Sequence, residues 1–503
     1  MKLSIRILIT LALFLAGFMP FARAARAQVT AQEQTPPPRP FLSRCHLPEL
    51  DTKAWCGRYE VFENRVSRRG RKIPLNVVIL PAFSDKPAPD AVFFFAGGPG
   101  QGAAGIAGYI GEALLAKVRQ DRDLVFVDQR GTGESNPLNC SLYNDDDLQG
   151  YFGEMFPSKG VRDCRERLEK VADLTQYTTS LAIEDFDDIR SALGYEKINL
   201  YGGSYGTTVA LAYLRRYGAH VRSAVLAGVA PVDFKLPLPF AKGAQYAIDR
   251  LILDCEADGA CRQAFPKLRE ELQSILDRLL KGPVSVEVIN PFTKQPQRIS
   301  LSRGPFTERL RMMLYNHNTA RQIPALIHLA YQGDFKPFML AALPQARATY
   351  QSLSLGVYFT VTCTEGVPLI TEEEIKRETE GTFIGDYRVR VHQRACQEWP
   401  RAELPKQFTS AVRSDVPVLM LSGEVDPASP HWLAAELTRQ LPNGLQVTIP
   451  YGTHGYFSDC INDFTAEFLS RGTVRGLNTS CLRGVRRPPF ITTVTESLSF
   501  NLR

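Results

Sequence analysis

The chain has 503 residues, of which 44% are hydrophobic, 10% aromatic and 22% charged. This balance excludes wholesale disorder and fibrous repeats, and the length predicts two or three domains or one large core with an insertion. The formal net charge is +6, but residues 1–27 carry four basic and no acidic side chains, so removing them leaves a charge of about +2. We therefore expect neither a nucleic acid nor an anionic membrane surface as a partner.

The first 27 residues are predicted to be a secretory signal peptide. Lys2 and Arg6 precede a short apolar run at 7–18, and two small-x-small cleavage sites (A-R-A) follow at 22–24 and 25–27. A membrane anchor is the alternative, but the apolar run is shorter than the roughly 20 residues that a spanning helix needs. The polar, proline-rich residues 28–44 are then predicted to be a linker. We expect an exported protein, periplasmic or extracellular, with no stable membrane insertion after signal removal.

Strand-like and helix-like segments alternate in the first part of the predicted core, residues 45–231. A hairpin is expected from residues 59–63 and 74–80. Further strands are expected at 91–95, 124–127, 197–201 and 224–226, and helices at 183–193 and 207–217. Runs that are apolar throughout are typical of strands buried on both faces. The alternation predicts a mostly parallel sheet with helices on both faces.

The pattern changes over residues 232–411, where long helical stretches appear at 241–255, 266–280 and 307–315. Strands return at 416–421 and 446–449, and a closing helix is expected at 460–470. We therefore predict one α/β core that is split by a mainly helical cap at 232–411 and completed by residues 412–503.

Ten cysteines agree with export, because an even number in an exported chain predicts five disulfides. They are Cys45, Cys56, Cys140, Cys164, Cys255, Cys261, Cys363, Cys396, Cys460 and Cys481. The sequence leaves the connectivity open; we expect sequential pairing, since each neighbouring pair lies in one predicted region. Metal ligation is the alternative, but neither C-x-x-C nor H-E-x-x-H occurs, so we predict no metal site.

The most specific local motif is G-G-S-Y-G at 202–206, between a predicted strand and a predicted helix. This setting is that of a nucleophile elbow, a tight turn that presents Ser204 at the top of the sheet. Gly202 and Gly206 would let the neighbouring backbone pass without a Cβ clash. A glycine-rich turn with a chance serine is the alternative.

A serine hydroxyl needs a base that is oriented by an acid, and in this architecture the order is serine, acid, histidine. Asp426 and His454 each follow a predicted strand at its carboxyl end, where ligands bind in open α/β sheets. The other six histidines lie near the linker, before a strand, in the insertion or too close behind Asp426. Glu424 is the rival acid, and we expect it still to lie on the strand.

The oxyanion hole requires two backbone N–H groups, one from Tyr205 and one from the loop after the strand at 91–95. That loop has the sequence A-G-G-P-G-Q-G at 96–102, and we expect Gly98 to supply the second N–H group. The same loop also matches G-x-G-x-x-A, and Asp128 ends the next strand, so a dinucleotide-binding fold is an alternative. Export and the Ser–Asp–His order argue against it, and no cofactor is expected.

At these residues the chain resembles the prolyl aminopeptidase and tripeptidyl aminopeptidase family of α/β-hydrolases. The likeness rests on G-G-P-G at 97–100, D-Q-R-G-T-G-E-S at 128–135, G-G-S-Y-G-T at 202–207, and the C-terminal region from 421 to 481. It covers about residues 45–490 and is weakest in the insertion. Ala96 and Tyr205 stand where prolyl aminopeptidases often have histidine and tryptophan, which favours the tripeptidyl branch. The resemblance implies an α/β-hydrolase fold with an inserted, mainly helical lid.

The resemblance further implies a serine exopeptidase that removes residues from the free N-terminus of a peptide. In the family, lid glutamates bind the α-amine of the substrate, and Glu365 is the position that matches best. A carboxylate under a lid would pair with the ammonium and set its distance to the scissile bond; a structural glutamate is the alternative. A carboxylesterase with the same triad, acting on a small ester, is the competing function, because fold and triad do not fix the leaving group. A non-catalytic binding protein is a more remote alternative.

Overall fold

The computed structural model describes residues 41–47, 53–455 and 457–493. The predicted signal peptide and most of the predicted linker lie outside the described residues. Strand β1 (Leu42–His46) includes residues 42–44, which we assigned to the linker. It pairs antiparallel with β2 (Lys53–Phe62), so the chain enters the sheet earlier than expected.

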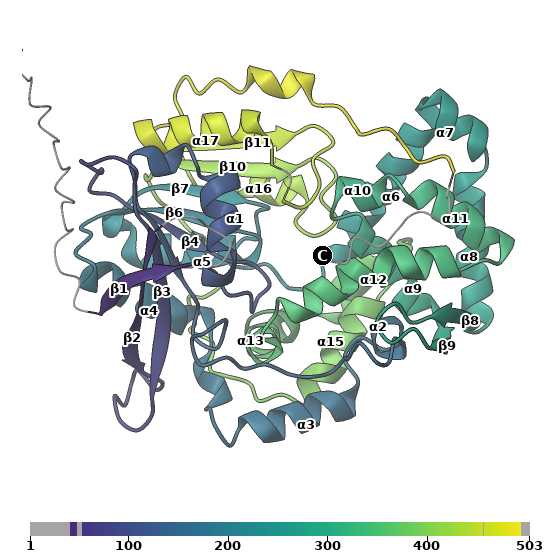
Figure 1. Cartoon of the computed structure of the whole chain (residues 1–503), viewed down its shortest axis with the longest axis horizontal. Helices are drawn as coiled ribbons and strands as arrows, with labels where there is room; N and C mark the ends of the chain where they lie inside the picture. The colour runs from purple at the N-terminus through teal and green to yellow at the C-terminus, as the bar shows by residue number, and fades with distance from the viewer. Residues whose placement is uncertain (1–40, 48–52, 456, 494–503) are drawn as a thin grey trace, which may run out of the picture. The chain divides into compact units, whose positions relative to one another are not determined.

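Within the described residues, nine strands form one central sheet (Figure 1). The neighbours β1–β2, β2–β3 and β3–β5 are antiparallel, and all pairs from β5 onward across the sheet are parallel, which confirms the predicted mostly parallel sheet. In spatial order after β2 the strands are β3 (Lys72–Leu80), β5 (Leu124–Val127), β4 (Val92–Phe95), β6 (Ile198–Gly203), β7 (Val221–Ala227), β10 (Val418–Gly423) and β11 (Gly444–Ile449).

Successive side chains along the strands pack alternately into two hydrophobic layers, one on each face of the sheet. Phe93 and Phe95 pack into one layer and Phe94 into the other, as the twofold period of a strand requires. The first layer is covered by α4 (Thr179–Ala192), α5 (Tyr205–Tyr217) and α16 (His431–Thr438). The second is covered by α1 (Ala107–Tyr109) and α17 (Asp459–Arg471). This double covering explains why β4 and β5 are apolar throughout.

The segment between β7 and β10 is mainly helical, as predicted, and has its own apolar core. Its helices are α6 (Phe240–Ala257), α7 (Gly259–Ala264), α8 (Leu268–Lys281), α9 (Arg303–Met313), α10 (His317–Ala320), α11 (Ile323–Gln332), α12 (Lys336–Gln351), α13 (Leu355–Val361), α14 (Glu372–Thr379) and α15 (Tyr387–Gln397). We call this segment the cap. It also contains a hairpin that we did not predict, β8 (Val284–Ile289) with β9 (Pro296–Leu301).

Two helices from the first half of the chain also join the cap. Helix α2 (Gln149–Phe152) contacts α12 and β9, and α3 (Ser158–Leu168) contacts α13 and α15. Tyr151 and Phe152 are buried in the cap's apolar core. Residues outside 232–411 therefore also pack against the cap.

All ten cysteines form disulfides, and each pairs with its nearest cysteine partner along the sequence, as we expected. The bonds are Cys45–Cys56, Cys140–Cys164, Cys255–Cys261, Cys363–Cys396 and Cys460–Cys481. Five disulfides fit an exported protein. Within the described ranges we find no helix of the length and hydrophobicity that crossing a bilayer requires.

Residues 473–493 form a segment that we call the strap. It leaves α17, where Cys481 is bonded to Cys460, and runs to the cap, as the yellow trace in Figure 1 shows. There Arg487 forms an ion pair of 2.6 Å with Asp254 of α6, and the backbone N–H of Ile491 donates to the carbonyl of Arg321 at 3.0 Å. The strap therefore fastens the cap to the far end of the core.

Candidate active site

The turn between β6 and α5 holds Ser204 in a backbone conformation that side chains rarely adopt. Its φ is +56° and its ψ is −125°, which is strained for any residue with a Cβ. A Cβ on Gly202 would lie 2.4 Å from the carbonyl oxygen of Gly206, and a Cβ on Gly206 would lie 2.0 Å from that of Phe95. The two glycines of the motif are therefore needed for the turn to fit against β4.

Backbone from two neighbouring segments surrounds Ser204. Its own N–H donates to the carbonyl of Ala227 at 2.8 Å, at the end of β7. A Cβ on Gly97 would lie 3.1 Å from Cβ of Ser204, so the glycine loop after β4 touches the serine. Gly98 has a φ of +110°, which favours glycine. Tyr205 is the first residue of α5, and a helix does not use the N–H of its first residue internally.

His454 and Asp426 lie in the loops after β11 and β10 and are in direct contact. Nδ1 of His454 is 2.9 Å from Oδ2 and 3.0 Å from Oδ1 of Asp426. Asp426 is buried and also accepts from the backbone N–H groups of Ala428 (2.8 Å) and Ser429 (2.9 Å). Burial opposes ionisation, but His454 and these donors outweigh it and lower the pKa of Asp426. The carboxylate can therefore orient the imidazole.

Ser204 and His454 both lie at the end of β7. Ser204 is hydrogen-bonded to Ala227, and a Cβ on the next residue, Gly228, would lie 3.2 Å from Cε1 of His454. Both side chains line the same pocket. Among the described residues no hydrogen bond joins Ser204 Oγ to His454; catalytic hydrogen bonds are often longer without substrate and tighten when it binds.

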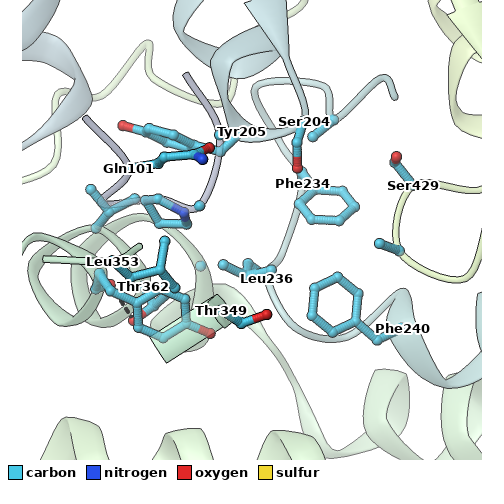
Figure 2. A pocket seen from close by; sticks show the side chains of 18 of the residues that line it. Gln101, Ser204, Tyr205, Phe234, Leu236, Phe240, Thr349, Leu353, Thr362 and Ser429 are labelled. Carbon is cyan, nitrogen blue, oxygen red and sulfur yellow. Dashed lines mark hydrogen bonds between the residues drawn. The ribbon is translucent and has the colours of Figure 1, made fainter. Parts of the chain in front are cut away.

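This pocket has a volume of about 350 Å³, which falls in the range of small-molecule sites. Gly98, Ser204, Tyr205, Glu365 and His454 all line it, so five of the six predicted site residues meet there, with Asp426 behind His454. Figure 2 shows Ser204 between Tyr205 and Ser429, with its hydroxyl directed toward an apolar wall. That wall includes Phe234, Leu236 and Phe240.

Glu365 lies in a π-helical turn (Thr362–Gly366) of the cap and is buried. Oε1 accepts from the backbone N–H of Thr179 at 2.7 Å, and Oε2 accepts from the Thr179 hydroxyl at 2.6 Å. The Thr179 hydroxyl in turn lies 2.6 Å from the hydroxyl of Tyr205. Burial raises the pKa of Glu365 to about 7, although the hydrogen bonds from Thr179 oppose this shift.

Three residues that our sequence reasoning missed support the predicted ones. Ser429 donates to Oδ2 of Asp426 at 2.8 Å and lies 3.3 Å from Nδ1 of His454. The ring of Tyr315 packs edge-on against the imidazole of His454, with centroids 4.9 Å apart. Thr179 holds Glu365. Only Ser429 carries a local signal, because a serine three residues after an aspartate can bond back to it.

Glu424 and Asp128, which we considered as the rival acid of the triad and as a ribose-binding acid, make other contacts in the structure. Glu424 lies just beyond β10, not on it as expected, and accepts from the backbone N–H of Tyr451 at 2.8 Å. Asp128 is buried and accepts from Asn76, Ala104 and Glu134 at 2.8–3.0 Å. Its carboxylate, just beyond β5, therefore ties neighbouring loops together. The described residues contain no cluster of three or more His, Cys, Asp or Glu side chains that could hold a metal ion.

Residues 90–459 match the family model of the alpha/beta hydrolase fold. The chain belongs to the α/β hydrolase fold family. It is 25% identical over 471 residues to serine protease Hip1 of Mycobacterium tuberculosis (strain ATCC 25618 / H37Rv), covering 85% of this chain and 87% of Hip1. It is 23% identical over 419 residues to tripeptidyl aminopeptidase of Streptomyces lividans, covering 78% and 76% of the two chains. The family and these relatives confirm the predicted fold class, the resemblance and the prediction of a serine hydrolase.

An esterase also appears among the relatives. Carboxylesterase B of Mycobacterium tuberculosis (strain CDC 1551 / Oshkosh) is 24% identical over 447 residues, covering 82% of this chain and 83% of that protein. Among solved structures, the proline iminopeptidase of Mycobacterium smegmatis superposes with a TM-score of 0.38 at 14% identity, covering 83% of this chain and 98% of that one.

Proposed function

We propose that this protein is an exported serine aminopeptidase of prolyl or tripeptidyl type, which acts through Ser204, His454 and Asp426 and an acyl-enzyme. Glu365 carries the proposal. It is an ionisable carboxylate, buried in the same pocket as the serine, and both its oxygens are held in position by one threonine.

In the proposed reaction, His454 takes the proton of the Ser204 hydroxyl as the serine oxygen attacks the scissile carbonyl. Asp426 holds the imidazole through Nδ1, so that Nε2 is the atom that exchanges protons. The backbone N–H groups of Tyr205 and Gly98 stabilise the oxyanion, aided by the N-terminus of α5. His454 then gives its proton to the leaving amine, and water releases the acyl group by the reverse sequence.

The proposal that the substrate has a free amino end rests on Glu365. A buried carboxylate whose pKa is near 7 lacks a counter-charge, and a substrate ammonium would provide one. Each carboxylate oxygen accepts one hydrogen bond from Thr179 and has a second lone pair left. An ammonium held there would fix the distance from the N-terminus to the scissile bond. The names of the tripeptidyl aminopeptidase and of the serine protease among the relatives support the same function.

The competing function is that of a carboxylesterase, which the name of one relative and the apolar wall of the pocket favour. The deciding experiment compares three substrates of the mature protein: a fluorogenic peptide amide with a free amino end, the same amide acetylated, and a short-chain ester. We expect the free amide to be cleaved at least about a hundredfold faster than the acetylated one, because an unpaired buried carboxylate is left when the ammonium is absent.

Ser204→Ala is the control and should abolish both cleavage and labelling by a fluorophosphonate. Fast ester cleavage without amide cleavage would overturn the peptidase proposal. Equal cleavage of the free and acetylated amides would overturn the role of Glu365 and with it the aminopeptidase assignment, and would leave a serine amidase. Recovery of the processed chain from the periplasm or the medium, with its N-terminus after residue 24 or 27, would test export.

A further inference from the structure

A second charged group lines the pocket, apart from the triad and from Glu365. It consists of Glu308 and Arg311 on α9 and Arg388 on α15, and we call it the cap charge cluster. Arg311 binds Glu308 through two hydrogen bonds, of 2.6 and 3.0 Å. Arg388 binds the same carboxylate at 2.7 Å. One carboxylate therefore serves two guanidinium groups.

The cluster has a net positive charge. Burial alone would raise the pKa of Glu308, but Arg311 and Arg388 lower it to about 2, so it carries one negative charge. His392 adds no charge, because burial holds its pKa well below the usual range. Tyr315 and Tyr358 accept from Arg311 and Arg388 at 2.7 and 3.1 Å, and both are neutral at pH 7. One buried and one largely buried cation thus face a single anion, and an uncompensated buried charge is unfavourable.

The guanidinium of Arg388 still has hydrogen-bonding capacity for an anion. Nε of Arg388 is buried and has no hydrogen-bond partner among the described residues. Both groups lie over the face of Phe240, with distances to the ring centroid of 4.5 Å for Arg311 and 5.6 Å for Arg388. Since Phe240 also lines the pocket, the positive charge lies along a low-dielectric wall, where electrostatic attraction is strongest.

The cap charge cluster and Glu365 act separately. The pKa of Glu365 is set by its own burial and by Thr179, with no guanidinium among the groups that shift it. Arg311 instead adjoins the base, because Tyr315 joins the Arg311 guanidinium to the imidazole of His454. The pocket therefore offers an anionic group at the Thr179 side and a cationic group at the His454 side.

We propose that Arg388, with Arg311, forms a subsite for a carboxylate of the substrate. This inference rests on the proposed function, in which the pocket holds a peptide. The carboxylate has two sources in a peptide: an acidic side chain of the released N-terminal fragment, or a carboxylate of the leaving part. Both would complete the hydrogen bonding of a guanidinium that Glu308 satisfies only in part.

Matched substrates distinguish these sources. The mature protein is assayed with fluorogenic tripeptidyl amides that differ only by Glu or Gln at one position, and with tetrapeptides that end in a free carboxylate or an amide. We expect the charged member of one pair to be cleaved about tenfold to a hundredfold faster in kcat/KM, the range for a charge-assisted hydrogen bond. The pair that shows the difference identifies the source.

The variant Arg388→Gln should bring this ratio close to one, and Glu308 retains its two bonds to Arg311 in that variant. Arg390→Gln, on the same helix but in an exposed ion pair with Glu372, is the matched control and should keep the ratio. Equal cleavage within every pair by the wild type would overturn the proposal. So would a preference that survives in Arg388→Gln.

A measurement that needs no peptide cleavage separates this inference from the proposed function. Glutarate should slow fluorophosphonate labelling of Ser204 more than the neutral glutaramide does, and Arg388→Gln should remove the difference. If peptides are not cleaved but this difference is found, the aminopeptidase proposal fails and the subsite stands. If peptides are cleaved and glutarate and glutaramide act alike, the subsite is overturned alone.

Discussion

The ring of Tyr315, which follows cap helix α9, packs edge-on against the imidazole of His454, with the two centroids 4.9 Å apart. Tyr315 also accepts a hydrogen bond from the buried Arg311, so its own position is fixed. The proposed base is thus held by Asp426 from the core and by an aromatic ring from the cap.

This contact predicts that Tyr315→Leu lowers kcat by about threefold to tenfold, the worth of an aromatic pair, because the imidazole loses one restraint. Tyr315→Phe keeps the ring and should keep most of kcat. Ester hydrolysis, which needs no amine recognition, is the measurement. A larger loss in Tyr315→Phe than in Tyr315→Leu would contradict the role of the ring and point to the hydroxyl.

Asp426→Asn should lower kcat by about four orders of magnitude, because an amide no longer holds the imidazole in its productive tautomer. Glu424→Gln is the matched control. Its carboxylate contacts the backbone of Tyr451, so it should change kcat by no more than about twofold. Steady-state rates, with thermal unfolding to verify the fold, would check both variants. If Glu424→Gln lowered kcat as much as Asp426→Asn does, Glu424 would be favoured as the acid that orients His454.

The raised pKa of Glu365 predicts a pH dependence specific to substrates with a free amine. The carboxyl group must ionise to bind an ammonium, so kcat/KM for the free amide should rise as the pH passes through about 7. It should fall again when the substrate amine deprotonates, at about pH 8. Dividing this profile by that of an ester isolates the contribution of Glu365. Glu365→Gln should abolish the rise, and an unchanged profile in that variant would exclude the assignment.

The same shift affects stability, with a defined sign. The folded chain holds the Glu365 proton up to about pH 7, whereas the unfolded chain releases it near 4.5, so this stabilising contribution is complete below pH 4.5 and is lost as the pH rises through 7. Glu365→Gln cannot titrate. Its free energy of unfolding, relative to wild type, should therefore increase by about 3 kcal/mol between pH 4.5 and pH 8. Urea unfolding at the two pH values measures this, and a constant difference would contradict it.

The strap predicts a loss of stability in Arg487→Ala. This change removes the shorter ion pair of the partly buried Asp254 of α6, which keeps only a 3.6 Å contact with Arg250, and we expect the free energy of unfolding to fall by about 2 kcal/mol. Arg483→Ala, at an exposed position of the same segment, is the control and should change it by less than about 0.5 kcal/mol. If both variants unfold alike, the strap does not fasten the cap.

The sequence predicts those strands that are buried on both faces, because all their side chains are apolar. Strands β4 and β5 are apolar throughout because both faces of the sheet are covered, and that pattern is visible in a short window. Strand β1 is not predictable in this way, since its residues are partly exposed and it pairs only with β2. The hairpin of β8 and β9 is half exposed and lies among helices, which hid its alternating pattern.

In the candidate active site, too, some positions follow from a general rule of the fold and others do not. Ser204, Asp426 and His454 follow strand ends, and the carboxyl ends of parallel strands meet at one edge, so their meeting is a matter of topology. No such rule predicts the positions of Tyr315, Thr179 and Arg388. Each acquires its place from the packing of the cap on the core, which depends on contacts between residues far apart in the chain.

The strap also has a consequence for biosynthesis. It is the last described part of the chain, yet it fastens helices that are synthesised more than a hundred residues earlier. A nascent chain that has not yet reached residue 487 already contains Ser204, Asp426 and His454 but lacks the ion pair between α6 and the strap. The contacts of the strap with Asp254 and Arg321 can therefore form only after residues 487–491 have been synthesised, well after the cap helices that they join.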